Sequence, residues 1–444
     1  MNIAAYPQYE NYRESYRERL DFPIPSHWSS EKARFLFKFN KGLTITKENL
    51  QDEGIPCVNY GEIHSKFGFV VDPERHDLKC VSPEYLKANK ASLLRRGDFV
   101  FADTSEDIEG SGNFTHLESD EPTFAGYHTL IARPLEKAQT RYLAYMLDST
   151  AFRKQVQKSV KGVKVYSISQ GLLKNLEILL PPIPEQLAIA AFLDNKCAKI
   201  DEAVRIKEAQ IKLLRERRQI LIQQAVTRGL NPDAPMKDSG IDWIGEIPAH
   251  WKVHRNFALF REIKQPGNAD LPVLSVSIHS GVSKEELSEE ENIRSIVKIE
   301  NRSSYKEVLP GDIAYNMMRA WQGGIGAVHT HGMVSPAYVV ARPVDYLAGD
   351  YFELLYRTPN FIRQMDAASK GIADFRKRLY WDDFRGLMTT LPPLAEQKEI
   401  IQYSEQISEK VSYAISIKQD QIATLKEYKT SLINAAVMGK IKVS

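Results

Sequence analysis

Among the residues that could do chemistry, a basic run without acidic residues comes first. Residues 151–176 contain no aspartate or glutamate, and their cations are Arg153, Lys154, Lys158, Lys161, Lys164 and Lys174. Tyr166, Ser167 and Ser169 stand among these cations. Lysine and arginine bind phosphate groups, whereas hydroxyl side chains can reach base edges. The run predicts a phosphate-binding loop at residues 161–169 after a helix, and a solvated helix face is the alternative.

A second set of polar residues combines amide and guanidinium groups with a glycine-rich loop. Asn316, Arg319 and Gln322 precede the segment Gly-Gly-Ile-Gly at 323–326. Asparagine and glutamine suit adenine edges, and arginine suits guanine. Further along the chain come the cations Lys370, Arg376, Lys377 and Arg378, followed by Tyr380 and Trp381.

The first half of the chain has a comparable loop, with Thr104 near its start and Asn113 near its end. The acids of this loop, such as Asp103, could accept a hydrogen bond from a cytosine amino group or simply cap a turn. Further candidates, which core packing or ordinary loop chemistry explains better, are Tyr127, His128, His329 and His331. No pattern identifies the base that any side chain reads.

These candidates fall in the two halves of an internal repeat. The segment Leu-Pro-Pro-Ile-Pro-Glu-Gln at 180–186 recurs as Leu-Pro-Pro-Leu-Ala-Glu-Gln at 391–397, which is an offset of 211 positions. The same register pairs Lys207 with Lys418 and Leu214 with Leu425. A repeat of this length indicates a chain built from two half-copies.

The globular part of each half varies more than the segment after it. Landmarks recur in order, namely His-Trp at 27–28 and 250–251, Gly-Asp at 97–98 and 311–312, and Arg-Pro at 133–134 and 342–343. Their offset drifts from 223 at the histidines to 209 at the arginines, whereas the segments after the Leu-Pro-Pro motifs align without gaps. This contrast suggests a fixed helical scaffold that carries two variable domains.

Local patterns predict mixed secondary structure followed by a long helix in each half. Runs of β-branched and aromatic residues at 98–101 and 337–341 predict strands, and residues 142–160 and 351–368 read as amphipathic helices. Long helices are expected from about residue 184 to 228 and from about 395 to 438, capped by Gly229 and Gly439. The fold class is therefore α+β, with two mixed α/β domains and two long, paired helices.

The long helices carry a heptad pattern, with β-branched residues at a and leucine at d, which favours a two-stranded coiled coil. Cations share seam positions in both copies, Lys207 with Lys418 and Arg218 with Lys429. Such cations either fix the register of the coil or extend to solvent. A helix of about 45 residues is roughly 65–70 Å long, close to two turns of DNA.

Bulk composition leaves the class of protein open. The 444 residues predict roughly two to four domains, and a net charge of +2 means that any basic surface is local. Cys57, Cys80 and Cys197 are too far apart for a CxxC site, and their odd number fits free thiols in a reducing compartment. The N-terminal residues are too polar for a signal peptide, and no apolar run approaches the ~20 residues of a membrane helix. We therefore expect a soluble, cytoplasmic protein.

A variable domain, a Leu-Pro-Pro-x-x-Glu-Gln boundary and a long helix, all present twice, closely resemble the specificity subunit of a type I restriction–modification system. The resemblance covers nearly the whole chain, from about Asp21 to Val443, and residues 1–20 match only loosely. It implies a target recognition domain at 21–180, a helical region at 181–229, a linker at 230–246, a second recognition domain at 247–391 and a second helical region at 392–444.

The resemblance also implies partners and a division of labour. Each recognition domain would read one half of a bipartite, asymmetric site in double-stranded DNA, and the helices would set the spacing and dock two methyltransferase (modification) subunits. Those subunits would bring S-adenosylmethionine, and restriction subunits would bring ATP-driven translocation and cleavage with Mg²⁺. This chain itself would bind no cofactor and would not be an enzyme. The predicted DNA-binding residues are Thr104, Asn113, Lys161, Lys164, Tyr166, Ser167, Asn316, Arg319, Gln322, Lys370, Arg376, Lys377 and Arg378.

Two alternatives remain at this point, a metal-dependent nuclease and a helical scaffold that binds proteins. Asp242 with Glu262 and Lys264 mimics the carboxylate spacing of a nuclease, but the first half has no acids at the aligned positions. The pair His329 and His331 lacks further spaced zinc ligands. The sequence contains neither a GxxxxGK[ST] phosphate loop nor an Asn/Asp-Pro-Pro-aromatic methyltransferase motif. Neither alternative explains two variable domains at a fixed separation.

Overall fold

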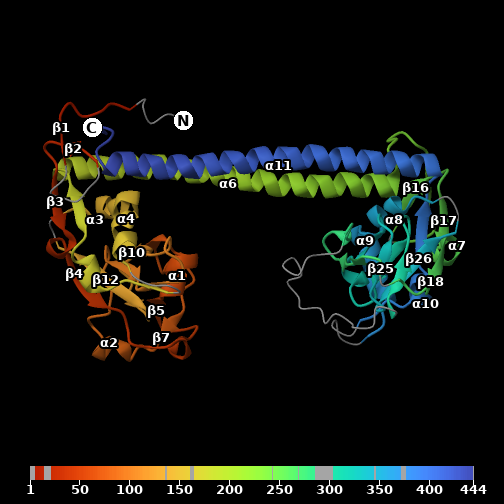
Figure 1. Cartoon of the computed structure of the whole chain (residues 1–444), viewed down its shortest axis with the longest axis horizontal. Coiled ribbons are helices and arrows are strands. Elements are labelled where there is room, and N and C mark those ends of the chain that lie inside the picture. Colours follow the sequence, from red (N-terminus) through yellow and green to blue (C-terminus); the bar gives the residue numbers. More distant parts are fainter. Residues whose placement is uncertain are drawn as a thin grey trace. The chain divides into compact units, whose positions relative to one another are not determined.

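The computed structural model describes residues 6–14, 22–135, 138–160, 165–242, 244–268, 270–285, 304–344, 347–371 and 377–443 (Figure 1). The chain divides into two compact units. Unit 1 comprises residues 1–207 and 420–444, and unit 2 comprises residues 208–419. Two long helices, α6 (Ile183–Arg228) and α11 (Leu394–Val437), contribute residues to both units. The mixed α/β class with two long helices is confirmed.

Unit 1 begins with short strands and adds most of its helices late. Besides its shares of α6 and α11, its elements are β1 (Tyr12–Arg13), β2 (Ile24–Pro25), β3 (Ser29–Lys32), β4 (Phe37–Lys41), β5 (Ile55–Val58), α1 (Tyr60–Ser65), β6 (Phe69–Val71), β7 (Cys80–Val81), α2 (Tyr85–Ala88), β8 (Phe99–Ala102), β9 (Thr104–Ser105), β10 (Phe114–Leu117), β11 (Phe124–Ala125), β12 (Thr129–Pro134), α3 (Thr140–Asp148), α4 (Thr150–Ser159), β13 (Tyr166–Ser167), α5 (Gln170–Leu173) and β14 (Glu177–Leu180).

Unit 2 repeats this plan. Besides its shares of the long helices, its elements are β15 (Met236–Asp238), β16 (Glu246–Pro248), β17 (Lys252–Arg255), α7 (Asn256–Leu259), β18 (Phe260–Ile263), β19 (Val273–Leu274), β20 (Val276–Ser277), β21 (Gly281–Val282), β22 (Lys306–Val308), β23 (Ile313–Asn316), the 3₁₀ helix η6 (Ala320–Gln322), β24 (Ile325–Ala327), β25 (Gly332–Val334), β26 (Tyr338–Pro343), α8 (Gly349–Tyr356), α9 (Pro359–Ala368), α10 (Trp381–Phe384) and β27 (Met388–Leu391).

The four strands of the central sheet in unit 2 have the same order as the first four of the five strands in unit 1. In unit 1 the order is β4-β12-β8-β10-β6, and in unit 2 it is β18-β26-β23-β24. Strand β8 alternates between two cores, because Phe99 and Phe101 pack with α3 and α4 while Val100 and Ala102 pack with α1. The predicted strands at 98–101 and 337–341 are therefore correct, each to within a residue or two.

The amphipathic segments predicted as single helices are each two helices, so that part of the prediction was wrong. In unit 1, Ser149 lies between α3 and α4, and its hydroxyl accepts a hydrogen bond from the Phe152 N–H at 3.3 Å. In unit 2, Thr358 caps α9 in the same way, and Pro359 follows it at the first helical position. An N-cap residue and a proline both begin a new helix rather than continue an old one.

The repeated Gly-Asp and Arg-Pro landmarks form the same ion pair in both units. Arg133 Nε lies 2.9 Å from Asp98 Oδ1, and Arg342 Nε lies 2.8 Å from Asp312 Oδ1. Both aspartate side chains are only 2% exposed. The preceding residue is Gly97 or Gly311, with φ of +87° and +92°, which explains the glycine in the motif. A buried carboxylate held by a two-pronged guanidinium fixes β8 to β12 and β23 to β26.

The boundary motif clamps the start of each globular part to the start of a long helix. Glu185 Oε2 accepts from Trp28 Nε1 at 3.2 Å, and Glu396 Oε2 accepts from Trp251 Nε1 at 3.0 Å. The histidine before each tryptophan reaches the same carboxylate, at 2.9 Å and 2.7 Å. The glutamine of each motif accepts a hydrogen bond from the backbone N–H of the residue just before a helix. Gln186 accepts from Gln139 before α3, and Gln397 accepts from Ala348 before α8. The motif thus begins the long helix and also holds the tryptophan in place through the glutamate.

The long helices end and pair largely as predicted. Gly229 and Gly439 follow α6 and α11 with φ of +76° and +69°, as expected of capping glycines. Seam residues are buried or half-buried, whereas Ile206 and Leu213 outside the seam are exposed. Within unit 1, Lys207 Nζ donates to Gln421 Oε1 at 2.7 Å, so this seam lysine meets the other helix rather than solvent alone.

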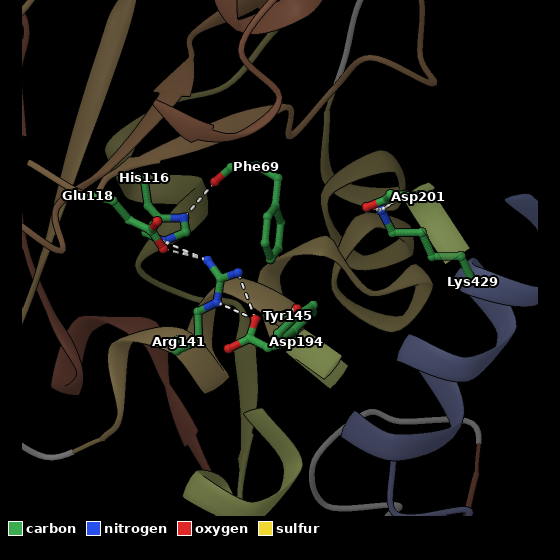
Figure 2. Close-up of polar contacts among 8 residues, drawn as sticks. All are labelled: Phe69, His116, Glu118, Arg141, Tyr145, Asp194, Asp201 and Lys429. Atoms are coloured by element: carbon green, nitrogen blue, oxygen red, sulfur yellow. Dashed lines mark hydrogen bonds and ion pairs between the residues drawn. The ribbon is translucent and has the colours of Figure 1, made fainter. Parts of the chain in front are cut away.

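A polar network joins the sheet of unit 1 to α6, and Figure 2 shows it. Arg141 on α3 binds Glu118 Oε1 at 2.6 Å and Asp194 Oδ1 at 2.7 Å. Tyr145 donates to the same Asp194 oxygen at 2.7 Å, and His116 contacts Glu118 at 3.1 Å. The hydrogen bond from His116 and the nearby guanidinium hold the pKa of Glu118 below its usual value. Figure 2 also shows Lys429 of α11 on Asp201 of α6, at 2.7 Å to each carboxylate oxygen.

The segment 6–14 completes unit 1 in the way that residues after α6 complete unit 2. Strand β1 pairs with β2, and β15 pairs with β16, in both cases antiparallel. Arg13 donates to the Trp28 carbonyl at 3.1 Å, and Lys237 donates to the Trp251 carbonyl at 2.7 Å. Residues 6–14 therefore match the segment after α6 in structure, although the sequences before residue 21 and before residue 247 match only loosely. None of the helices in the described ranges has the length and apolar composition of a membrane span.

Candidate nucleic-acid interface

In unit 1, two short strands bring separate predicted segments together. Thr104 lies opposite Ser167, and Ser105 lies opposite Tyr166, in the antiparallel pair β9–β13. The Ile168 N–H extends this pairing by donating to the Asp103 carbonyl at 2.8 Å. The sequence predicted a loop at residues 161–169, but residues 166–167 form a strand because the backbone groups of β9 are available to pair with it. Lys161 and Lys164 lie outside the described residues.

Asn113 is held beside this strand pair by a chain of hydrogen bonds. Arg153 Nη1 donates to Asn113 Oδ1 at 2.7 Å, and Asn113 Nδ2 lies 2.9 Å from His64 Nδ1. His64 Nε2 lies 2.9 Å from the Thr104 carbonyl oxygen, which can only accept. The consistent assignment is a neutral His64 that donates from Nε2 and accepts at Nδ1. The amide of Asn113 is thereby fixed in one orientation, with one N–H and one oxygen lone pair left over.

Asn113, His64 and Thr104 line a hollow of about 780 Å³ on unit 1. Its other walls include Tyr60, His128 and the acidic loop at 106–109. Asp107 Oδ1 accepts from the Gly110 N–H, so this acid caps a turn, which is one of the two roles the sequence left open. Asp103 instead binds His128 at 3.1 Å. The hollow therefore offers amide, hydroxyl, imidazole and carboxylate groups, and no lysine or arginine is among its described lining residues.

Unit 2 has the same backbone contact as the one between Ile168 and Asp103, with different side chains around it. We call this contact and its surroundings the junction of each unit. The Leu379 N–H donates to the Met317 carbonyl at 2.9 Å, as Ile168 does to Asp103 in unit 1. This contact places the loop 316–322 beside residues 377–379. Lys377 Nζ lies 5.0 Å from the centre of the Trp321 ring, and Arg319 Nη1 donates to Gln322 Oε1 at 2.8 Å. The structure therefore brings together the two predicted groups of unit 2, apart from Arg376, which lies outside the described residues.

Several predicted side chains of unit 2 already have partners. Asn316 Oδ1 accepts from the Met318 N–H at 3.0 Å, which is the contact of a capped turn. Lys370 lies 2.8 Å from Asp383, and Lys377 lies 2.7 Å from Asp366. Lys370 also pairs with Arg378 through backbone hydrogen bonds of 2.9 Å. Arg319 is exposed and Gln322 is half-buried, and the side-chain partner described for each is the other, so these two are the best placed of the predicted residues of unit 2 to meet a ligand.

His64 and Arg153 are the interface residues whose role the sequence did not reveal. His64 lies on α1 and drew no attention because it has no motif around it, and Arg153 was read only as part of the basic run. Both act on Asn113 through contacts between residues far apart in the sequence.

The described residues contain no group of three or more histidine, cysteine, aspartate or glutamate side chains that could hold a metal ion. Within the nuclease-like pattern, Glu262 is paired with Lys264 at 2.9 Å.

Comparison with known proteins shows what this chain is similar to. Residues 25–213 match the family model described as the type I restriction modification DNA specificity domain. The putative type I restriction enzyme MjaX specificity subunit of Methanocaldococcus jannaschii is 23% identical over 95% of this chain and 95% of its own length. Over nearly its whole length the chain is therefore similar to specificity subunits of type I restriction–modification systems. The EcoKI specificity subunit of Escherichia coli K12 is 22% identical over 94% of this chain and 90% of its own length.

Solved structures agree on the fold of this family. A chain described in work on assembly and conformational transition of the type I R-M system aligns with a TM-score of 0.62 and 16% identity, over 95% of this chain and 100% of that chain. The HsdS subunit from Thermoanaerobacter tengcongensis aligns with a TM-score of 0.50 and 17% identity, over 95% and 99%. At such identities the likeness concerns the fold alone.

Proposed function

We propose that this chain is the non-catalytic, DNA-reading subunit of a type I restriction–modification complex, and that each globular domain reads one half of a bipartite, asymmetric target. The observation that carries the proposal is the shared junction, formed by Ile168 with Asp103 in unit 1 and by Leu379 with Met317 in unit 2. Both units use the same backbone contact there but surround it with different side chains. Two such sites suit two different half-sites, whereas a symmetric dimer would suit a palindrome.

Asn113 is the side chain whose chemistry points most directly to a base. Asparagine reads adenine by donating to N7 and accepting from the N6 amino group. The hydrogen bonds to His64 and Arg153 leave one donor and one acceptor site of Asn113 for such a pair. In unit 2, Gln322 could read adenine and Arg319 guanine, with Thr104 and Ser167 as hydroxyl contacts in unit 1.

The remaining predicted residues fit a supporting role in this proposal. Tyr166 would pack beside a base or sugar, and Lys161, Lys164, Lys370, Arg376, Lys377 and Arg378 would contact phosphates, with Asn316 shaping its loop. Phosphate contacts fix the position of a protein on the duplex, and base contacts select the sequence. The domain boundaries at residues 21, 180, 247 and 391 remain part of this proposal.

The long helices would set the distance between half-sites and dock two modification subunits. In support, they expose large apolar side chains away from the seam: Leu213 is 62% exposed, Ile220 55% and Tyr413 69%. Exposed apolar side chains in such number on one pair of helices commonly mark a protein interface. The modification subunits would supply S-adenosylmethionine and the catalytic residues, and the restriction subunits would use ATP and Mg²⁺.

The test is a genome-wide methylation map of cells that express this chain together with modification subunits. We expect a single interrupted, asymmetric motif that disappears when the chain is deleted. Asn113→Ala should relax or abolish one half of the motif and leave the other half unchanged, since each mismatched base contact costs about 1–3 kcal/mol. Asn360→Ala, an exchange of the same type outside the site, is the control and should leave both halves intact.

Two further variants separate the parts of the proposal. Replacing residues 21–180 with another recognition domain should change one half-site only, and a change in both halves would contradict the idea of two readers. Inserting four residues, about one helical turn, into α6 should change the spacer without changing the bases read. An assembled complex that methylates no motif with its cofactor present would favour a protein-binding scaffold instead.

A further inference from the structure

A group of cations on α6 plays no part in the junctions described above. Lys212, Arg215 and Arg218 line a hollow of about 420 Å³ in unit 2, together with Arg357 at the end of α8. The opposite wall is the start of α9, including Thr358 and Pro359. The first turn of a helix carries a partial positive charge, which adds to the charge of the four side chains. The hollow is therefore a place for an anionic ligand.

The charge of the three α6 cations is not neutralised by neighbouring acids. Lys212 and Arg215 are exposed and Arg218 is half-buried, and within the described ranges none of the three makes an ion pair. Glu353 also lines the hollow, but it accepts from the Ala327 N–H at 2.8 Å and lies 3.3 Å from Arg357. Burial raises the pKa of Glu353 above its ordinary value. Glu216 is the remaining acid of the lining.

The hollow adjoins the loop that holds the candidate base-reading residues of unit 2. Arg357 Nη2 donates to the Ile278 carbonyl at 3.2 Å and also to the His279 carbonyl. A Cβ on Gly323, directly after Gln322, would lie 4.0 Å from the same Ile278 oxygen. The turn at residues 278–279 thus lies between the cations and the loop 316–322. The cluster and the loop that carries Gln322 are therefore neighbours through this turn.

We propose that Lys212, Arg215, Arg218 and Arg357 bind the phosphate backbone of DNA beside the half-site read by unit 2. This inference rests on the proposed function and adds to it a sequence-independent contact made by a long helix. Residues 212 and 215 are about 4.5 Å apart along the helix axis, close to the ~3.4 Å axial spacing of phosphates on one DNA strand. The cluster should therefore raise affinity without selecting bases.

The cluster is only partly repeated in the other half of the chain. In the 211-residue register, its α6 members correspond to Ala423, Lys426 and Lys429 of α11. The first of these has no charge, and the last is engaged with Asp201. Arg215 matches the cation Lys426, so Lys212 is the α6 member whose charge is absent from the other half of the repeat. A DNA duplex with two different half-sites is itself asymmetric, so it can bind two helices that carry different numbers of cations.

The test is the salt dependence of DNA binding by the full chain with Lys212→Gln and Arg215→Gln combined. The probe is a mixed-sequence duplex of about 40 base pairs, roughly four helical turns. The logarithm of the binding constant falls with the logarithm of salt concentration by about 0.9 for each phosphate contact. We expect the double variant to bind with a slope smaller in magnitude by about 1.8. Exchanging the two residues, Lys212→Arg with Arg215→Lys, keeps the charge and should keep the slope.

A matched control removes the same charge from the other helix of unit 2. Lys398 and Lys410 are exposed on α11, and Lys398→Gln with Lys410→Gln should leave the slope unchanged. An unaltered slope in the α6 variant, an equal fall in the control, or no binding by the unmodified chain would overturn the inference. So would an α6 variant that only weakens assembly with modification subunits. If the unmodified complex still methylates its motif, the proposed function stands in each of these cases.

Discussion

Removal of the Glu396 carboxylate should lower the stability of unit 2 and leave that of unit 1 unchanged. Glu396 accepts from Trp251 Nε1 at 3.0 Å and meets His250 at 2.7 Å. Trp251 is fully buried, so in a Glu396→Ala variant its indole N–H would lose its acceptor inside the core of unit 2. His250 is half-exposed and can turn to water instead. The tryptophan therefore determines the size of the effect.

The magnitude follows from two contributions. A hydrogen bond to a charged group contributes about 1.5–3 kcal/mol, and a buried donor left unsatisfied costs about 1–3 kcal/mol. These contributions overlap, because both describe loss of the same acceptor, so we expect a destabilisation of about 2–4 kcal/mol. Glu396→Gln keeps an oxygen acceptor for the indole and should cost only about 1 kcal/mol.

Hydrogen exchange measured peptide by peptide gives the result for each unit separately. In the Glu396→Ala variant, amides of the β17–β27 pair should exchange roughly 30- to 700-fold faster, since about 1.4 kcal/mol corresponds to a factor of ten. Amides of the matching β3–β14 pair in unit 1 should keep their rates, and Glu185→Ala should reverse the pattern. Equal acceleration in both units, or a change below threefold, would refute the clamp.

Three further predictions concern unit 1 and the cysteines. Arg141→Met removes the link between Glu118 and Asp194, both partly exposed, and should lower the free energy of unfolding by about 0.5–2 kcal/mol in a urea titration. The pKa of Glu118 is lowered chiefly by the hydrogen bond from His116, so its contribution to stability is present above the ordinary pKa of about 4.3 and is lost as the pH falls through the lower folded value. Glu118→Gln should remove that part of the acid dependence, as seen in unfolding at stepwise lower pH. All three cysteines are buried and unpaired, and burial raises the pKa of Cys197 to about 11, so an aromatic disulfide reagent should label them only after denaturation.

The parts of the fold that were predictable from the sequence depend on local signals. The ends of α6 and α11 follow from a proline-rich start and a glycine with positive φ, both of which act within a few residues. The split of each amphipathic segment at Ser149 and Thr358 had a local signal too, but the apolar periodicity continues across it. Periodicity reports which face is buried and does not report where a helix is interrupted.

The candidate site was only partly predictable because its geometry is non-local. The types of residue at Thr104, Asn113 and Gln322 indicated polar contacts, yet the pairing of β9 with β13 joins segments that no sequence pattern relates. The role of His64 exists only through its contacts with Asn113 and Thr104. The cations of the α6 cluster occupy helix surface, where a charged residue is so common that its type alone carries little information.

Within each unit the repeated landmark residues hold the fold, whereas the side chains at the junction differ from one unit to the other. The Asp98–Arg133 and Asp312–Arg342 pairs fix the central strands, and the two glutamates of the boundary motifs fix the tryptophans beside the long helices. These contacts involve buried groups whose loss is costly, so the landmark residues can change little. The junction side chains point to hollows or solvent and bond mainly to one another. Their chemistry can therefore change from one unit to the other while the frame stays the same, which is the physical requirement for a protein that reads two different half-sites.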